Sequence, residues 1–224
     1  MKRLLALGAV SALALSAAPA LAQDVTITNA RLVTGDGSAP IEGGTVVVRG
    51  GAVVYAGAAA GAPASGSAID ARGAWVTPGI FAALTTLGLA DVSAVGESND
   101  ISAGGSPFSA SLDASSSINP VSQHILVHRA AGITRAATST TPSGSIFAGQ
   151  GAIIDLDGDT RPVMQARAFQ MVDLGEGGAR LAGGSRPAAH ALLRSALREA
   201  QALVGKPGIC LLYTSDAADD MQCV

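Results

Sequence analysis

Two parts with different residue patterns meet in the stretch Ile69-Asp-Ala-Arg-Gly-Ala-Trp-Val-Thr-Pro-Gly-Ile-Phe-Ala-Ala-Leu-Thr-Thr86. Its first half is short and interrupted by glycine, as in strands joined by tight turns. Thr77-Pro78-Gly79 is a breaker, and residues 80–89 form an apolar run suited to a buried strand. We therefore expect the boundary between a β part and an α/β part near Pro78.

The residues before this stretch have a β pattern. Val25-Thr26-Ile27 alternates, and Arg31-Leu32-Val33 either extends that strand or begins the next one. Thr45 to Val48 is a strand, and Arg49-Gly50-Gly51 turns it into residues 52–56. That spacing predicts a β-hairpin.

The residues after it alternate between helix and strand signals. A polar Ser/Gly-rich loop, 97–117, precedes a helix that we expect to open at Asn119-Pro120, and a strand follows over 133–138. Helix, glycine and strand in this order match half of a βαβ crossover, so the predicted fold class is α/β. The later expected elements are strands over 152–156 and 168–174 and a helix over 186–204, capped by Ser185.

The N-terminus has the three parts of a secretory signal peptide over residues 1–22. Lys2 and Arg3 are followed by an apolar stretch over 4–18 and by the cleavage signal Ala20-Leu21-Ala22. A membrane-spanning helix needs roughly 20 consecutive apolar residues, and this run is shorter. We predict export to the bacterial periplasm, with no membrane attachment after cleavage.

The C-terminus changes character abruptly over 209–224. Both cysteines, Cys210 and Cys223, lie there. The run 210–219 resembles peptides translated from sequencing-adapter DNA. We expect a non-native tail on an N-terminal piece of a longer parent, with an ordinary native tail as the alternative, and no function is assigned to the cysteines.

Composition excludes some partners. The 224 residues carry a formal charge of -3. The sequence has no basic patch of the kind that nucleic acid requires, so no nucleic-acid partner is expected. Oligomeric state is left open.

An ordered set of short blocks resembles the start of the amidohydrolase superfamily, particularly its imidazolonepropionase-like members. The blocks are Asn29-Ala30-Arg31-Leu32-Val33 with Gly35 and Gly37, Ile41 to Val48, Ile69 to Gly73, Val76 to Gly79, and Ala131-Gly132-Ile133-Thr134. The resemblance implies part of a composite β-sandwich over 23–77 and the first part of a (β/α)8 barrel over 78–208. It also implies a metal-dependent hydrolase of carbon–nitrogen bonds other than peptide bonds, acting on a small amide or cyclic amide.

The family's first barrel strand carries His-x-His after Pro-Gly, and here the matching positions hold Leu84 and Thr86, with Ala82 in place of the preceding Asp. Residues two apart on a strand face the same side, where two imidazoles would share one ion. Leucine cannot ligate a metal, and a threonine hydroxyl is a poor zinc ligand. No metal or other cofactor is expected for this chain, whereas the resemblance implies zinc or another divalent metal in the full-length parent. Whether the parent is an active enzyme or an inactive envelope binding or scaffold protein is left open.

Five other patterns are interpreted as structural. His124 and His128 share a helix face, but Ile125 stands where H-E-x-x-H has Glu, which favours a structural or surface role. Asp155-Leu-Asp157-Gly-Asp159 resembles the start of a calcium-binding loop, but Thr160 and Ala166 stand where such a loop has Gly and Glu, so a turn is expected. Ser143-Gly144-Ser145 is not a nucleophile elbow. The glycines of 175–184 are interpreted as a flexible loop, and Gly149-Gln150-Gly151 as a turn.

Overall fold

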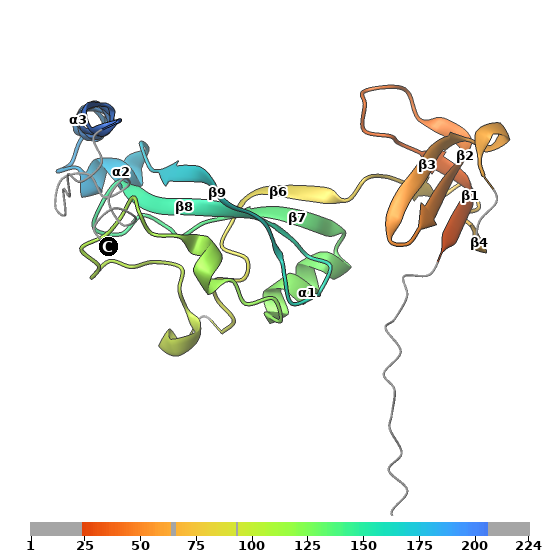
Figure 1. Ribbon diagram of the computed structural model, residues 1–224, viewed down its shortest axis with the longest axis horizontal. Coiled ribbons are helices and arrows are strands. Elements are labelled where there is room, and N and C mark those ends of the chain that lie inside the picture. Colours follow the sequence, from red (N-terminus) through yellow and green to blue (C-terminus); the bar gives the residue numbers. More distant parts are fainter. Residues whose placement is uncertain (1–23, 64–65, 93, 206–224) are drawn as a thin grey trace, which may run out of the picture. The chain divides into compact units, whose positions relative to one another are not determined.

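The computed structural model describes residues 24–63, 66–92 and 94–205. The predicted signal peptide and the cysteine-containing tail lie outside the described residues. The chain divides between Pro78 and Gly79 into two compact units. In Figure 1 the strands of the first unit are orange, and the second unit runs from yellow to blue.

The first unit is a five-stranded sheet around β1. Its strands are β1 Val25–Leu32, β2 Ile41–Arg49, β3 Ala52–Ala58, β4 Ser67–Asp70 and β5 Trp75–Val76. The order is β3-β2-β1-β4, and β5 also pairs with β1. The predicted hairpin is confirmed as β2–β3, with Arg49 opposite Ala52. Residues 31–32 belong to β1 rather than to a new strand.

The block Ile69 to Gly73 wraps around a bulge in β1. Asn29 has a left-handed backbone with φ 53°, and its side-chain amide donates to Asp70 Oδ1 at 3.1 Å. The same carboxylate oxygen accepts from the Arg72 N–H at 2.9 Å, and the Gly73 N–H donates to the Asn29 carbonyl at 2.7 Å. These bonds take the chain from β4 to β5, so that both strands run parallel to β1.

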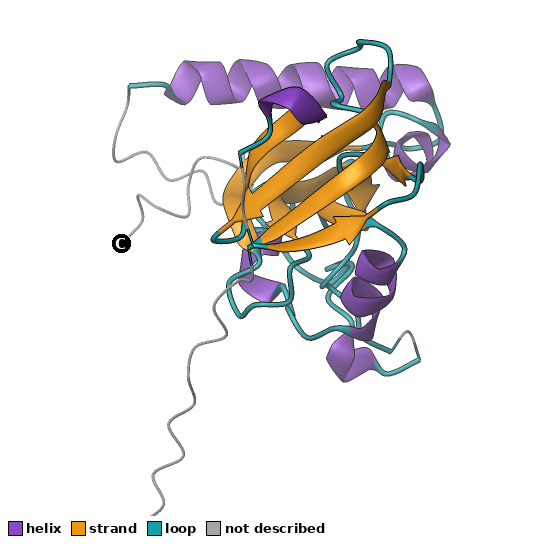
Figure 2. Ribbon diagram, turned by 90° about the vertical axis from the view of Figure 1, so that its right-hand side faces the viewer, coloured by secondary structure: helices purple, strands orange, loops and turns teal. Residues whose placement is uncertain are grey.

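Among its described residues, the second unit holds a four-stranded mixed sheet and three α-helices. Its elements are β6 Ile80–Thr85, α1 Gln123–Ala130, β7 Ile133–Thr138, β8 Phe147–Asp155, β9 Val163–Val172, α2 Glu176–Leu181 and α3 Arg186–Leu203. Short 3₁₀ turns occupy Ala59–Gly61 in the first unit and Gly96–Ser98 and Ala114–Ser117 in the second. The α/β class is confirmed, and Figure 2 shows strands and helices in separate colours.

Only the first pair of strands in this sheet is parallel. β6 and β7 run parallel on either side of α1 in the chain, as the βαβ pattern predicted. β8 and β9 are antiparallel to their neighbours, which the expectation of successive barrel strands did not anticipate. The connecting segments 139–146 and 156–162 are too short for a parallel return, which needs about a dozen residues. The described residues therefore form no complete barrel.

The core of this unit lies on one face of the sheet. Ala82, Ala136, Ile154 and Val163 form one row across the four strands. Ile125 of α1 is 1% exposed and belongs to the same cluster as this row. On β6 the expectation of a buried strand was wrong, since Ile80 and Phe81 are 57% and 49% exposed.

The helices differ from the predicted ones in two places. α1 begins at Gln123, because the Ser122 hydroxyl accepts from the His124 N–H, whereas Asn119 accepts from the Val121 N–H in a preceding turn. The glycine-rich segment expected to be a loop contains α2. α3 is confirmed, with the Ser185 hydroxyl accepting from the Ala188 N–H. No helix among the described residues is long and apolar enough to cross a membrane.

Candidate functional site

A hollow of about 460 Å³ opens at the carboxyl end of β6. In sheets with parallel strands, ligands bind outside this end of the strands. Both positions at which the family resemblance expects histidine line the hollow. Its full lining is Leu84, Thr85, Thr86, Leu87, Ala90, Asn99, Ile101, His124 and His128.

The strand wall of the hollow is held by paired threonines. Thr85 Oγ1 donates to the Ala137 carbonyl at 3.1 Å and lies 3.2 Å from Thr138 Oγ1. Thr138 Oγ1 also donates to the Leu87 carbonyl at 2.7 Å, which ties the turn after β6 to β7. The register between β6 and β7 slips after Ala82. Because regular alternation ends there, four consecutive residues from Leu84 line one wall, rather than Leu84 and Thr86 alone.

Helix α1 forms the second wall and carries both histidines. The Ser122 hydroxyl donates to the Ala90 carbonyl at 3.0 Å, and the Gln123 N–H donates to Asp91 Oδ1 at 3.0 Å. These bonds fix the start of the helix against the segment that follows β6. His128 Nδ1 lies 2.7 Å from the His124 carbonyl oxygen one turn earlier. His124 is exposed and His128 is half-buried.

The third wall belongs to the long segment between β6 and α1. Asn99 Oδ1 accepts from the Ile101 N–H at 3.2 Å, which closes a local turn. The Asp100 N–H donates to the Leu89 carbonyl at 2.7 Å, and the Thr141 N–H donates to the Ile101 carbonyl at 2.7 Å. The polar segment predicted as a loop is therefore held in place on two sides.

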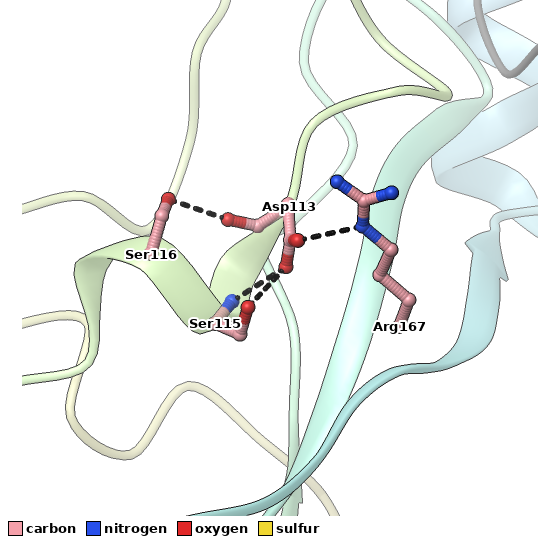
Figure 3. A network of polar contacts seen from close by, with 4 residues as sticks. All are labelled: Asp113, Ser115, Ser116 and Arg167. Carbon is pink, nitrogen blue, oxygen red and sulfur yellow. Dashed lines mark hydrogen bonds and ion pairs between the residues drawn. The ribbon is translucent and has the colours of Figure 1, made fainter. Parts of the chain in front are cut away.

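An ionic network, drawn in Figure 3, attaches the end of the same segment to the β8–β9 hairpin. Asp113 Oδ2 accepts from Arg167 Nε at 2.9 Å, and Asp113 Oδ1 accepts from the Ser115 N–H and hydroxyl at 2.9 and 2.6 Å. The Ser116 hydroxyl donates to the Asp113 carbonyl. Burial alone would raise the pKa of Asp113, but the bonds from Ser115 and Arg167 outweigh it and lower the pKa.

The sequence contained one local signal for this network and lacked the other. Asp113 precedes Ser115 at the spacing of a helix cap, but Arg167 is 54 residues away. Arg167 occupies a bulge of β9 with a left-handed backbone, φ 50°. That conformation is unusual for arginine and cannot be anticipated from residue type.

The remaining sequence patterns are structural. The acidic run is a turn, as predicted, in which Asp157 and Asp159 accept from main-chain N–H groups two residues on. Burial, assisted by the charges of Asp157 and Asp159, raises the pKa of Asp155. The glycines at 149–151 lie within β8 rather than in a turn. Gly149 lies at a register shift of β8 and has φ 100°, and a Cβ there would collide with the Leu112 carbonyl. Ser145 accepts from the Phe147 N–H.

The hollow does not fit the metal that the family resemblance implies at the first barrel strand. Leu84 offers no donor atom there, and Thr86 offers a single neutral hydroxyl. Within residues 24–205, leaving aside the three that are not described, no group of three or more His, Cys, Asp or Glu side chains could hold a metal ion. No catalytic step through a metal is therefore derived for these residues.

No protein-family model matches the chain, and no curated protein matches it. Among solved structures it is similar to an amidohydrolase from Thermotoga maritima MSB8, with a TM-score of 0.67 and 20% identity over 81% of this chain and 49% of that one. A second likeness is to the L-hydantoinase (dihydropyrimidinase) from Arthrobacter aurescens, with a TM-score of 0.25 and 28% identity over 32% of this chain and 15% of that one. The second TM-score is too low to support an argument. The chain thus spans about half the length of the T. maritima protein, and over that part the two chains share a fold.

Proposed function

We propose that the chain is part of an exported amidohydrolase-superfamily protein whose hollow receives a small amide or cyclic amide. Hydrolysis of carbon–nitrogen bonds other than peptide bonds is proposed for the full-length parent. The first part of a (β/α)8 barrel and part of a composite β-sandwich belong to the same proposal. Cleavage after residue 22 would release the protein into the bacterial periplasm.

One observation carries this proposal: the hollow lies at the carboxyl end of β6, the strand that follows the Pro-Gly step, in a chain with an amidohydrolase-type fold. Active sites of barrel enzymes are built at this end of the strands. The lining combines apolar side chains with a few polar groups, as in most small-molecule sites. An amide offers one N–H donor and one carbonyl acceptor, which suit Asn99, Thr86 and the imidazoles.

The test is made on the full-length parent. Its bound metal is quantified by mass spectrometry, and its turnover is screened against cyclic amides and dipeptides. Bound divalent metal with hydrolysis of at least one cyclic amide is expected. Absence of both metal and turnover would refute the enzymatic proposal.

A second candidate function is favoured by the residues at the end of β6. Leu84 and Thr86 replace the two metal-binding histidines that the resemblance expects, so the parent would be an inactive binding or scaffold protein of the envelope. In that case, the ligands expected on later strands would be missing too. The coding sequence that follows Val204 decides between the two, because an intact set of later His and Asp ligands would contradict the inactive version.

A further inference from the structure

We propose that His124 and His128 form a two-imidazole chelate for a late first-row divalent ion, with Cu²⁺ bound most tightly. Both side chains line the hollow, one turn apart on α1. This site is separate from the first-strand histidine positions, Leu84 on β6 and Thr86 directly after it, and it requires no hydrolytic activity. It therefore goes beyond the proposed function.

The spacing of the two histidines suits chelation. Residues four apart on a helix have Cβ atoms about 5–6 Å from each other. Helical side chains lean toward the N-terminus, so the His128 ring extends along the helix toward His124. The contact between His128 Nδ1 and the His124 carbonyl at 2.7 Å places the ring in that orientation.

The same contact fixes which nitrogen of His128 is available. A carbonyl oxygen only accepts hydrogen bonds, so Nδ1 must carry the proton and donate. Nε2 then keeps its lone pair. Metal-binding histidines in proteins use this arrangement, in which the second ring nitrogen donates to a carbonyl and orients the first.

His124 is available in a different way. No described residue forms a hydrogen bond with its ring, while its main-chain N–H is held by the Ser122 hydroxyl at 3.3 Å. Ile125 next to it is fully buried against the sheet. The rotation of α1 about its axis is thereby fixed, and both imidazoles stay on the side of the hollow.

The donor set selects the metal. Two imidazole nitrogens suit Cu²⁺, Ni²⁺ and Zn²⁺, and the affinity of such sites follows the order in which Cu²⁺ is strongest. The hollow leaves room for water at the remaining positions, giving the nitrogen–oxygen set typical of Cu²⁺. Among the described residues that line the hollow, none is Lys or Arg, so no cationic side chain in the lining opposes the ion.

The test uses the full chain with Cys210→Ser and Cys223→Ser, so that thiols do not compete for copper. CuCl₂ is titrated by isothermal calorimetry, and the copper complex is examined by electron paramagnetic resonance. The variants are His124→Ala and His128→Ala. The matched control is His190→Ala, since the chain has three histidines and the third is exposed on α3.

We expect one Cu²⁺ per chain with a two-nitrogen hyperfine pattern. Each of the two hollow variants should weaken Cu²⁺ binding at least tenfold, because even the loss of a residue that only supports a metal ligand costs about 10- to 100-fold in affinity. His190→Ala should bind Cu²⁺ as tightly as the chain with all three histidines. A one-nitrogen pattern, or equal affinity in all three variants, would overturn the proposal. The spectrum is recorded on the chain with all histidines present, so the answer stands even where a variant fails to fold.

Discussion

Replacing Asp113 by Asn tests whether the Asp113–Arg167 network holds the long segment that lines the hollow. The substitution keeps one side-chain acceptor for the Ser115 N–H and removes the negative charge that faces Arg167 at 2.9 Å. The Arg167 side chain is 50% exposed and that of Asp113 is 20% exposed. The ion pair therefore contributes at most about 1 kcal/mol.

Charge-assisted bonds from Ser115 contribute as well. Hydrogen bonds to ionised groups are stronger than neutral ones, so we expect a total loss of about 1–2 kcal/mol in the free energy that keeps this segment closed. A loss of that size corresponds to a roughly 5- to 30-fold change in the local opening equilibrium. The effect is local because the network joins one segment to one hairpin.

Hydrogen–deuterium exchange measures this opening directly. The Ser115 N–H donates to Asp113, and the Gln150 N–H donates to the Leu112 carbonyl beside it. Both amides should exchange about 5- to 30-fold faster in Asp113→Asn. The matched control is Arg186→Ala, which breaks a more exposed ion pair with Glu176 at 3.4 Å and should leave these amides unchanged. Equal exchange in the wild type and in Asp113→Asn would refute the reasoning.

Three further predictions concern the same unit. Lowering the pH should open the network, because the pKa of Asp113 is lower in the folded chain than its unfolded value near 3.8. The stability that this difference adds is present above pH 3.8 and is lost as the pH falls through the folded pKa. Protection of the Ser115 N–H, measured as its exchange rate relative to an unstructured peptide at the same pH, should therefore fall, and constant protection down to about pH 2 would contradict this. Ile125→Ala should lower the free energy of unfolding of this unit by about 2–5 kcal/mol in urea, because the side chain is buried. Val127→Ala, at a 64% exposed position, should have little effect, and equal losses would show that Ile125 does not belong to the hydrophobic core. Gly79→Ala should cost about 1–3 kcal/mol, since the new Cβ would collide with the Thr134 side chain. The double variant with Thr134→Ala removes Oγ1 and Cγ2 but keeps the Thr134 Cβ, so it should recover part of the loss, and no recovery would place the clash elsewhere.

Local signals in the sequence predicted the elements that depend on few residues. Arg49-Gly50-Gly51 predicted the β2–β3 hairpin, and Ser185 predicted the start of α3. The glycine at 132 and the strand after it predicted the β6–α1–β7 crossover. In each case, turn or cap chemistry within a few residues decides the structure.

The remaining elements depend on contacts that residue type does not reveal. Gly177 and Gly178 lower helix propensity, yet both lie within α2, where a Cβ on Gly178 would collide with the Asp173 carbonyl. β8 runs antiparallel to β7 because the 139–146 connection is short. The apolar blocks of the sequence did not show where β7 ends and β8 begins, so the length of this connection could not be predicted.

The site was predicted only in part for the same reason. Leu84 and Thr86 were predicted at the end of the strand that follows Pro78-Gly79, and both line the hollow. His124 and His128 were recognised as a pair, but their place in the hollow depends on how the long polar segment folds over it. The role of Arg167 could not be predicted from the sequence, because the bulge that holds it and its contact with Asp113, 54 residues away, form only when the chain folds.

The central claim is that the hollow at the end of β6 binds a small amide. Ligand-observed nuclear magnetic resonance with 2-pyrrolidone, a cyclic amide, tests it on the full chain. Leu84→Trp fills the hollow from a 59% exposed position, and Leu197→Trp places the same side chain on α3 at a 54% exposed position. We predict saturable binding that Leu84→Trp abolishes and Leu197→Trp preserves, whereas no saturable binding, or equal binding by both variants, would contradict the account.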